Sequence, residues 1–324
     1  MAEGADGRRL AGEGRDVEAA LSDSLIGWLP KQRVDLSVIL SSLVSGVLLG
    51  GISALAALGL SLVLGVLRLV NLAHGDFLTL GAYGAFYLLA LTGLDPLLGL
   101  PVVALAVAAI AAPLYRLLLR PLAGRGAEAP MMTMFGVSIV VQNVLLYAAS
   151  ADTRSIETGY ASSALTLGPL TVPLVYVIGF VIALVAIGVV HLLLSRSAFG
   201  RDLRASAQDP TAAATVGVPV ARVQLLTFVL GAMCAGAGGT MTGLAFAFTP
   251  SSGASYLLNS FAVVVLGGLG SVAGTLVAGI TIGVLQSLGG ITLGDGYRDL
   301  VALALFLIVL VIRPQGLIAA RGAR

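Results

Sequence analysis

The densest group of polar side chains in this sequence stands between two long apolar segments. Asn71, His74 and Asp76 follow Arg68 within nine residues, and Thr79 comes three residues later. Hydrocarbon supplies no hydrogen-bond partners, so polar groups at membrane depth are candidates for a functional path. One interpretation is a broken helix or half-helix end. In that case Asn71, His74, Asp76 and Thr79 line a substrate path. The alternative is an ordinary cytoplasmic turn, in which Arg68 is one of the basic residues of the inner side.

A glycine-rich stretch, Gly267-Gly268-Leu269-Gly270-Ser271, forms a second interruption. Glycines in such a position open backbone amides and carbonyls toward a polar path, or allow helices to pack closely. Gly268, Gly270 and Ser271 are therefore further path candidates. The chain has only two histidines, and no Ser-His-Asp arrangement is evident, so a hydrolase site is not predicted.

A third pattern predicts a short helix outside the membrane. Asp209 suits an N-cap, and Pro210 suits the first helical position. Gly217 can adopt the left-handed conformation that ends a helix. We expect about two turns over 210–216. With Ala213 on it and Arg204 before it, such a helix suits docking into a groove on a partner protein, and a merely stiff loop is the alternative.

The composition places these patterns in a membrane protein. The chain has 324 residues, of which 58% are hydrophobic and 10% are charged, and it contains 42 glycines. Its mean hydropathy is +1.02. These values exclude a soluble enzyme, a disordered chain and a nucleic-acid-binding domain. The single cysteine, Cys234, lies in an apolar stretch and is expected to be a packing residue.

The apolar runs predict an all-α polytopic fold. The run 223–294 contains no Asp, Glu, Lys or Arg. As one helix it would be about 108 Å long, more than three times the roughly 30 Å hydrocarbon thickness. It must fold back, and Gly and Pro residues mark breaks at 249–253 and 267–271. We expect eight to ten transmembrane helices with broken or re-entrant segments.

Basic residues predict the orientation. Fifteen of the 18 Lys and Arg residues lie in the two tails and in the loops 116–128 and 195–222. The positive-inside rule therefore places both termini and these loops in the cytoplasm.

The same pattern divides the chain into three parts. Residues 1–36 form a charged tail, in which 17–29 are able to form an amphipathic helix on the membrane surface. Residues 37–313 form the transmembrane domain, and 314–324 form a second cytoplasmic tail.

The sequence contains no Gly-x-x-x-x-Gly-Lys-Ser/Thr motif, and its one lysine, Lys31, is in the N-terminal tail. A P-loop is therefore excluded. If ATP drives this protein, another chain binds it.

Three blocks, at 57–76, 200–209 and 265–274, closely resemble the permeases of branched-chain amino-acid ABC importers of the LivH type. The resemblance covers about 37–318. It implies a bacterial inner-membrane subunit paired with a paralogous permease, two cytoplasmic ATPases and a periplasmic substrate-binding protein. It also implies that the partner ATPases bind ATP and Mg²⁺ and that this chain holds no cofactor. The segment 204–217 matches the loop that engages the ATPase.

The substrate stays open at this point. Relatives with similar motifs carry urea, amides or other small polar solutes, so these are alternatives to branched-chain or related hydrophobic amino acids. A less favoured alternative is an ion-coupled secondary transporter, for which Asp76 is the fair candidate for a buried ionisable group.

Overall fold

A computed structural model of the chain describes residues 36–168 and 170–312. Its α-helices are α2 (Leu36–Leu67), α3 (His74–Thr92), α4 (Pro96–Leu114), α5 (Glu128–Ala149), α6 (Leu174–Arg196), α7 (Ala198–Gln208), α8 (Pro210–Thr215), α9 (Val220–Ala245), α10 (Gly253–Gly267), α11 (Val272–Leu293) and α12 (Arg298–Ile312). Short helical turns are η1 (Tyr115–Leu119), η2 (Arg120–Leu122), η3 (Pro250–Ser252) and η4 (Asp295–Tyr297). The predicted amphipathic helix at 17–29 and the tail 314–324 lie outside the described residues.

The chain divides into two units, residues 1–39 and 40–324. Only the first four residues of α2 represent the first unit among the described residues, and all that follows concerns the second. The predicted all-α polytopic fold is confirmed. A two-stranded antiparallel hairpin, β1 (Ala164–Leu167) and β2 (Leu170–Pro173), is the β-structure of the described part and pairs Ala164 with Pro173.

Six of the described helices are long and apolar enough to cross a membrane: α2, α4 with its η1 and η2 extension, α5, α6, α9 and α11. Eight to ten crossings were expected from the sequence. Three other helices, α3, α10 and α12, do not meet the length and mean hydropathy required of a membrane-spanning helix. Helix α3 carries the polar His74 and Asp76 in its first turn, and α10 and α12 have 15 residues each. The sequence predicts breaks near the starts of α3 and α10, whereas it predicts that the runs 77–94 and 299–312, which form most of α3 and α12, cross the membrane.

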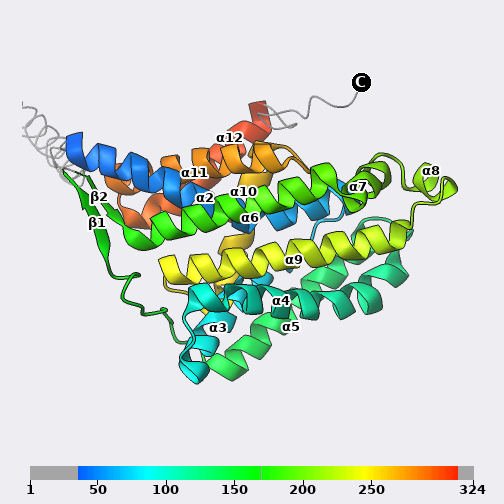
Figure 1. The fold of residues 1–324 in the computed structure, drawn as a ribbon, viewed down its shortest axis with the longest axis horizontal. Coiled ribbons are helices and arrows are strands. Elements are labelled where there is room, and N and C mark those ends of the chain that lie inside the picture. Colours follow the sequence, from blue (N-terminus) through cyan, green and yellow to red (C-terminus); the bar gives the residue numbers. More distant parts are fainter. Residues whose placement is uncertain (1–35, 169, 313–324) are drawn as a thin grey trace, which may run out of the picture. The chain divides into compact units, whose positions relative to one another are not determined.

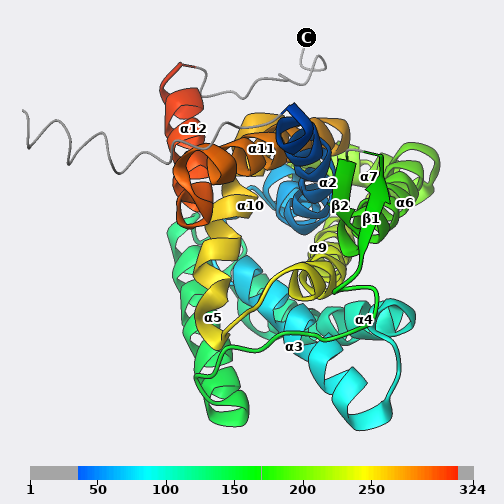
Figure 2. The same cartoon turned by 90° about the vertical axis from the view of Figure 1, so that its left-hand side faces the viewer.

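The breaks predicted in the charge-free run are confirmed. Helix α9 ends at Ala245, η3 and α10 follow, and a turn at 268–271 leads into α11. With 15 residues α10 is about 22 Å long, which is less than the roughly 30 Å of the hydrocarbon layer. Figure 2 shows α2 and α9 nearly end-on while α10 runs across the view, so α10 follows a different direction from its neighbours.

The two ends of α2 meet different parts of the chain. Near its start, the Thr171 backbone N–H in β2 donates to the Ser41 hydroxyl at 3.2 Å. Beyond its end, the Arg68 guanidinium donates to the Ala207 carbonyl in α7 at 3.1 Å. Figure 1 shows the hairpin and α7 at opposite ends of α2. We call these the hairpin end and the α8 end.

This arrangement concerns the predicted orientation. The sequence places the tail 1–36 on the same side as the loop 195–222, because both contain basic residues. The structure separates Ser41, near the start of α2, from that loop, since α2 runs from the hairpin end to the α8 end. The tail 1–35, which contains five of the basic residues used to predict the orientation, lies outside the described residues.

Glycines allow α2 to pack closely against its neighbours. A Cβ at Gly59 would overlap the Gly231 carbonyl of α9, and one at Gly50 would overlap the backbone of α11 at Gly279. Such close backbone approach is characteristic of helix pairs in membranes, where small residues replace the hydrophobic driving force. Helix α2 is therefore enclosed by its neighbours, and 83% of its most apolar stretch is buried.

Candidate functional site

The polar cluster predicted at 71–79 lies where α2 gives way to α3, and all four candidate side chains are buried. The exposed fractions are 2% for Asn71, 1% for His74, 2% for Asp76 and 0% for Thr79. Helix α3 begins at His74, as the half-helix interpretation predicts. These four side chains are therefore shielded from solvent, whereas Arg68, which precedes them, is exposed.

Every member of the cluster has a partner within the chain. Asn71 Oδ1 accepts a hydrogen bond from the Ala73 backbone N–H at 3.1 Å, which closes the turn before α3. His74 Nε2 lies 2.9 Å from the Ala56 carbonyl oxygen of α2, a contact that requires the hydrogen on Nε2. Thr79 donates to the carbonyl oxygen one turn earlier at 3.1 Å. The His74 contact therefore joins the start of α3 to α2, and the other two bonds are local to the break and to α3.

Asp76 joins this break to two other helices. Its carboxylate lies close to the Ser138 hydroxyl of α5. A Cβ at Gly253, the first residue of α10, would overlap the Asp76 carboxylate. A Cβ at Gly75 would likewise overlap the Gly253 carbonyl oxygen. The starts of α3 and α10 are therefore in direct contact.

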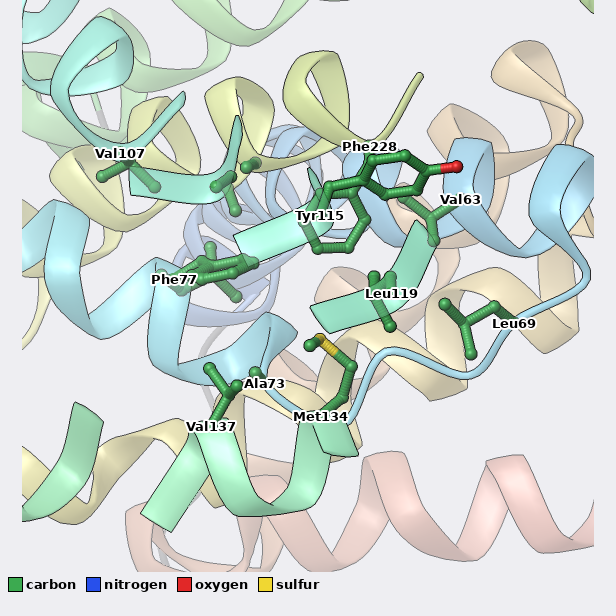
Figure 3. Packing of buried hydrophobic residues seen from close by; sticks show 14 of the residues in the cluster. Val63, Leu69, Ala73, Phe77, Val107, Tyr115, Leu119, Met134, Val137 and Phe228 are labelled. Atoms are coloured by element: carbon green, nitrogen blue, oxygen red, sulfur yellow. The ribbon is translucent and has the colours of Figure 1, made fainter. Parts of the chain in front are cut away.

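Apolar side chains near the start of α3 form a buried hydrophobic cluster (Figure 3). Leu69, Ala73 and Phe77 pack with Met134 of α5 and Phe228 of α9. Phe77 and Phe228 meet edge to face, with ring centroids 6.1 Å apart. Because the polar groups are satisfied and sealed by this packing, the arrangement is a structural junction. The four residues stay predictions as path residues.

The glycine-rich break at 267–271 is a tight turn between α10 and α11. Gly268 and Gly270 have positive φ angles of 85° and 75°, which favour glycine. Ser271 Oγ accepts a hydrogen bond from the Gly274 backbone N–H at 3.0 Å and caps α11. Gly270 packs against Gly65 near the end of α2. These features explain the turn, and its role in transport stays a prediction.

A cavity of about 410 Å³ lies among α2, α9, α10 and α11. Its lining combines mostly apolar residues of α2 and α3 with polar residues of α10. Its lining residues are Leu49, Ile52, Ser53, Ala56, Leu78, Thr242, Phe246, Ala247, Ser252, Ser255, Tyr256, Asn259, Ser260, Gln286, Gly296 and Arg298. None of the predicted path residues is among them.

The polar wall comes mainly from one face of α10. Ser252, at the end of η3, is followed on this face by Ser255, Tyr256, Asn259 and Ser260, at the three- and four-residue spacing of a single helix face. Sequence reasoning missed this stripe because it followed charged groups and glycines. The signal was present, since these residues interrupt an otherwise apolar run at helical spacing.

The predicted short helix is confirmed as α8, Pro210–Thr215. Asp209 caps it, because its Oδ1 accepts hydrogen bonds from the N–H groups of Thr211 at 2.8 Å and Ala212 at 3.0 Å. Gly217 follows with a φ of +88°. Helix α7, which precedes α8, was not predicted, although Ser197 caps it in the same way.

In α8, Ala213 does not face outward, although the docking prediction places it against a partner protein. Ala213 is buried against its own chain, with 4% exposed, while Val216 just after α8 is 79% exposed. The surface available to a partner is therefore formed by the other face and by Val216. Arg204 donates to the Leu194 carbonyl at the end of α6 and holds α7 against that helix.

Arg68 links the α2–α3 break to the end of α7. Its guanidinium donates to the carbonyl oxygens of Ala207 at 3.1 Å and Gln208 at 3.5 Å. Arginine suits this position because carbonyl groups at a helix C-terminus attract cations. A continuous set of contacts therefore runs from α7 through Arg68 and the break to the start of α10.

Comparison with known proteins identifies the family. The model of the family described as "Branched-chain amino acid transport system / permease component" matches residues 42–310. The chain is 31% identical to the high-affinity branched-chain amino acid transport system permease protein BraD of Pseudomonas aeruginosa, over 86% of this chain and 95% of that protein. It is 28% identical to the corresponding LivH of Escherichia coli, with the same coverage.

A third relative is the probable branched-chain amino acid transport permease protein LivH of Methanocaldococcus jannaschii, with 31% identity over 81% of this chain and 87% of that protein. No solved structure matches the chain. The family match spans most of the transmembrane part that the structure describes. The chain therefore belongs to the permease-component family of branched-chain amino acid transport systems and is a multi-pass membrane transport subunit.

Proposed function

We propose that this chain is the membrane-spanning subunit of an ATP-driven importer that carries branched-chain or related hydrophobic amino acids. The observation that carries the proposal is the cavity, in which an apolar wall faces a stripe of uncharged polar groups, in a member of this permease family. Such a cavity matches a solute with an apolar side chain and a polar, net-neutral end.

The distribution of arginine side chains supports an orientation of the chain across the membrane. The α8 end carries Arg68, Arg116, Arg120, Arg125, Arg196, Arg201, Arg204 and Arg222, whereas the hairpin end of the described part carries Arg154 and Arg298. The positive-inside rule assigns the α8 end to the cytoplasm. The cavity, whose lining includes Phe246 and Arg298, then lies toward the outer face of the inner membrane.

The partners follow from this orientation. Two cytoplasmic ATPases, which bind ATP and Mg²⁺, dock at the α8 end. The exposed surface of α8 and Val216 supplies their contact. A periplasmic substrate-binding protein delivers the amino acid at the hairpin end. A paralogous permease completes the membrane part, and this chain itself holds no cofactor.

Movement of the ATPases reaches the cavity through the contacts described above. Helix α8 is attached to α7, whose end is held by Arg68. Arg68 leads into the break at Asn71, and Gly75 of α3 touches Gly253 at the start of α10. A shift of α7 and α8 therefore displaces α10 and its polar stripe, which exposes the cavity to one side or the other.

Reconstitution tests the function. The chain is co-expressed with the neighbouring permease, ATPase and binding-protein genes, and the assembly is inserted into proteoliposomes. We expect co-purification of the ATPases and leucine uptake that requires ATP and the binding protein. Uptake driven by an ion gradient without ATP would indicate a secondary transporter. Uptake of urea or amides without leucine would assign the alternative substrate class.

A further inference from the structure

We propose that the carboxamides of Asn259 and Gln286 form a binding site, inside the cavity, for the zwitterionic end of an amino acid. This inference rests on the proposed function and deepens it, because it assigns solute recognition within the membrane subunit to two named residues. Asn259 lies on α10 and Gln286 on α11, and both line the same cavity.

The first observation is a buried carboxamide oxygen without a partner. Asn259 Oδ1 is buried without a hydrogen-bond partner among the residues that the structure describes. Gln286 is 5% exposed and lines the same cavity. A buried polar group without a partner destabilises a fold, and most native examples have a functional explanation or bind water or a ligand. The unpartnered oxygen of Asn259, on a cavity that the Gln286 carboxamide also lines, indicates a ligand.

The second observation is the chemistry of the carboxamide. Each one offers an N–H donor for a carboxylate oxygen and a carbonyl acceptor for an ammonium group. Two of them, together with the hydroxyl of Ser255, can satisfy both ends of a zwitterion. A charged side chain would attract one end and repel the other.

The third observation is that the described lining of the cavity is mostly uncharged. Among the described residues that line the cavity, the one charged side chain is Arg298. The opposite wall carries Leu49, Ile52 and Leu78, which offer an apolar surface to the side chain of the solute. The volume of about 410 Å³ lies within the roughly 300–1,000 Å³ typical of small-molecule sites. The site therefore suits a net-neutral solute with one apolar end.

Transport measurements on the full assembly test this site. We expect Asn259→Leu and Gln286→Leu each to lower the maximal rate of ATP-dependent leucine uptake about tenfold or more. Asn143→Leu is the matched control, because Asn143 is exposed on α5 and bonded to the Ile139 carbonyl of its own helix. It makes the same chemical change outside the cavity and should leave uptake unchanged.

A charge substitution tests the chemistry directly. Equilibrium binding of leucine and of leucinamide, which has the ammonium but no carboxylate, is measured on the assembly in nanodiscs without the binding protein. The unmodified protein should bind leucine more tightly. Gln286→Glu should reverse that order, because its carboxylate attracts the ammonium and repels the carboxylate of leucine. An unchanged order of affinities would overturn the proposal.

The outcomes separate the two proposals. If the unmodified assembly does not take up leucine, the proposed function is wrong. If it does, and both leucine variants transport normally, only the carboxamide site is wrong. Should Asn259→Leu fail to assemble with the ATPases, Gln286→Leu and the order of affinities in Gln286→Glu decide the matter.

Discussion

Two groups of polar residues lie inside this protein, and they differ in whether they have partners. In the junction at the start of α3, Asn71, His74 and Thr79 each bond to a backbone group of the chain. On the cavity wall, Asn259 and Gln286 line the same cavity, and Asn259 Oδ1 is buried without such a partner. The first group connects backbone segments of the chain, while the second is the group that we propose binds a solute.

The difference shows that depth in the membrane does not by itself identify a transport site. A polar residue there needs a partner, and that partner is either the protein or the solute. The junction attracted attention in the sequence because it contains an imidazole and a carboxylate. The polar face of α10 on the cavity contains only amides and hydroxyls, yet it includes Asn259 Oδ1, which is buried without a partner.

The largest expected effect belongs to the junction. Gly75→Ala places a methyl group on the Gly253 carbonyl and should destabilise the fold by about 1–3 kcal/mol or more. We expect a several-fold fall in the amount of folded subunit in the membrane, measured by fluorescence-detected gel filtration. Gly136→Ala on α5 is the control, since a Cβ there meets nothing within 4 Å. Equal yields of the two variants would contradict the close contact of α3 with α10.

A reciprocal pair of leucine substitutions sharpens the comparison. His74→Leu removes the bond to Ala56 and should lower thermal stability by about 1–3 kcal/mol, with transport per assembled transporter unchanged. Asn259→Leu should leave stability equal or higher, because it removes an unpaired buried amide, while transport falls. Thermal unfolding in detergent and leucine uptake are measured on both. Loss of stability in Asn259→Leu with normal transport would remove the distinction.

Arg68 extends the comparison to a polar group that joins two moving parts. Arg68→Gln removes its bonds to the end of α7, so we expect ATP hydrolysed per leucine transported to rise several-fold. Stability should change by less than about 1 kcal/mol, because Arg68 is exposed. Arg201→Gln, on the exposed surface of α7, is the control. If both variants keep normal coupling, the route through Arg68 is wrong.

The smallest expected effect concerns α8. Asp209→Ala removes the N-cap and should cost about 1 kcal/mol of helix stability, which corresponds to about a fivefold weaker interaction with the ATPases. The test is the affinity between the purified permease and the purified ATPase subunits. Asp202→Ala, which removes a carboxylate from α7 without removing a cap, should keep the affinity of the unmodified chain.

Features determined by neighbouring residues could be predicted from the sequence. Asp209 and Gly217 predict α8 almost to the residue, because helix caps depend on a few adjacent groups. The breaks at 249–253 and 267–271 could also be predicted, since a charge-free run of that length cannot cross the membrane once.

Features determined by contacts between distant segments could not be predicted from the sequence. Ala213 faces its own chain because of how α8 rests beside α7, which the spacing of residues does not reveal. The direction of α2 is set by two contacts between distant segments: Ser41 meets Thr171, 130 residues away, and Arg68, just after α2, meets Ala207, 139 residues away. The orientation of Asn259 and Gln286 toward one cavity depends on the packing of α10 and α11.

The enclosure of α2 determines where neighbours can attach. Its closely packed glycines, at Gly50 and Gly59, leave no free surface along the middle of the helix. By contrast, the most apolar stretch of α5 is only 17% buried and that of α6 is 28% buried. Lipid and any second membrane chain must therefore meet this subunit on α5, α6 and the other outer helices, while α2 serves as the internal axis around which they are arranged.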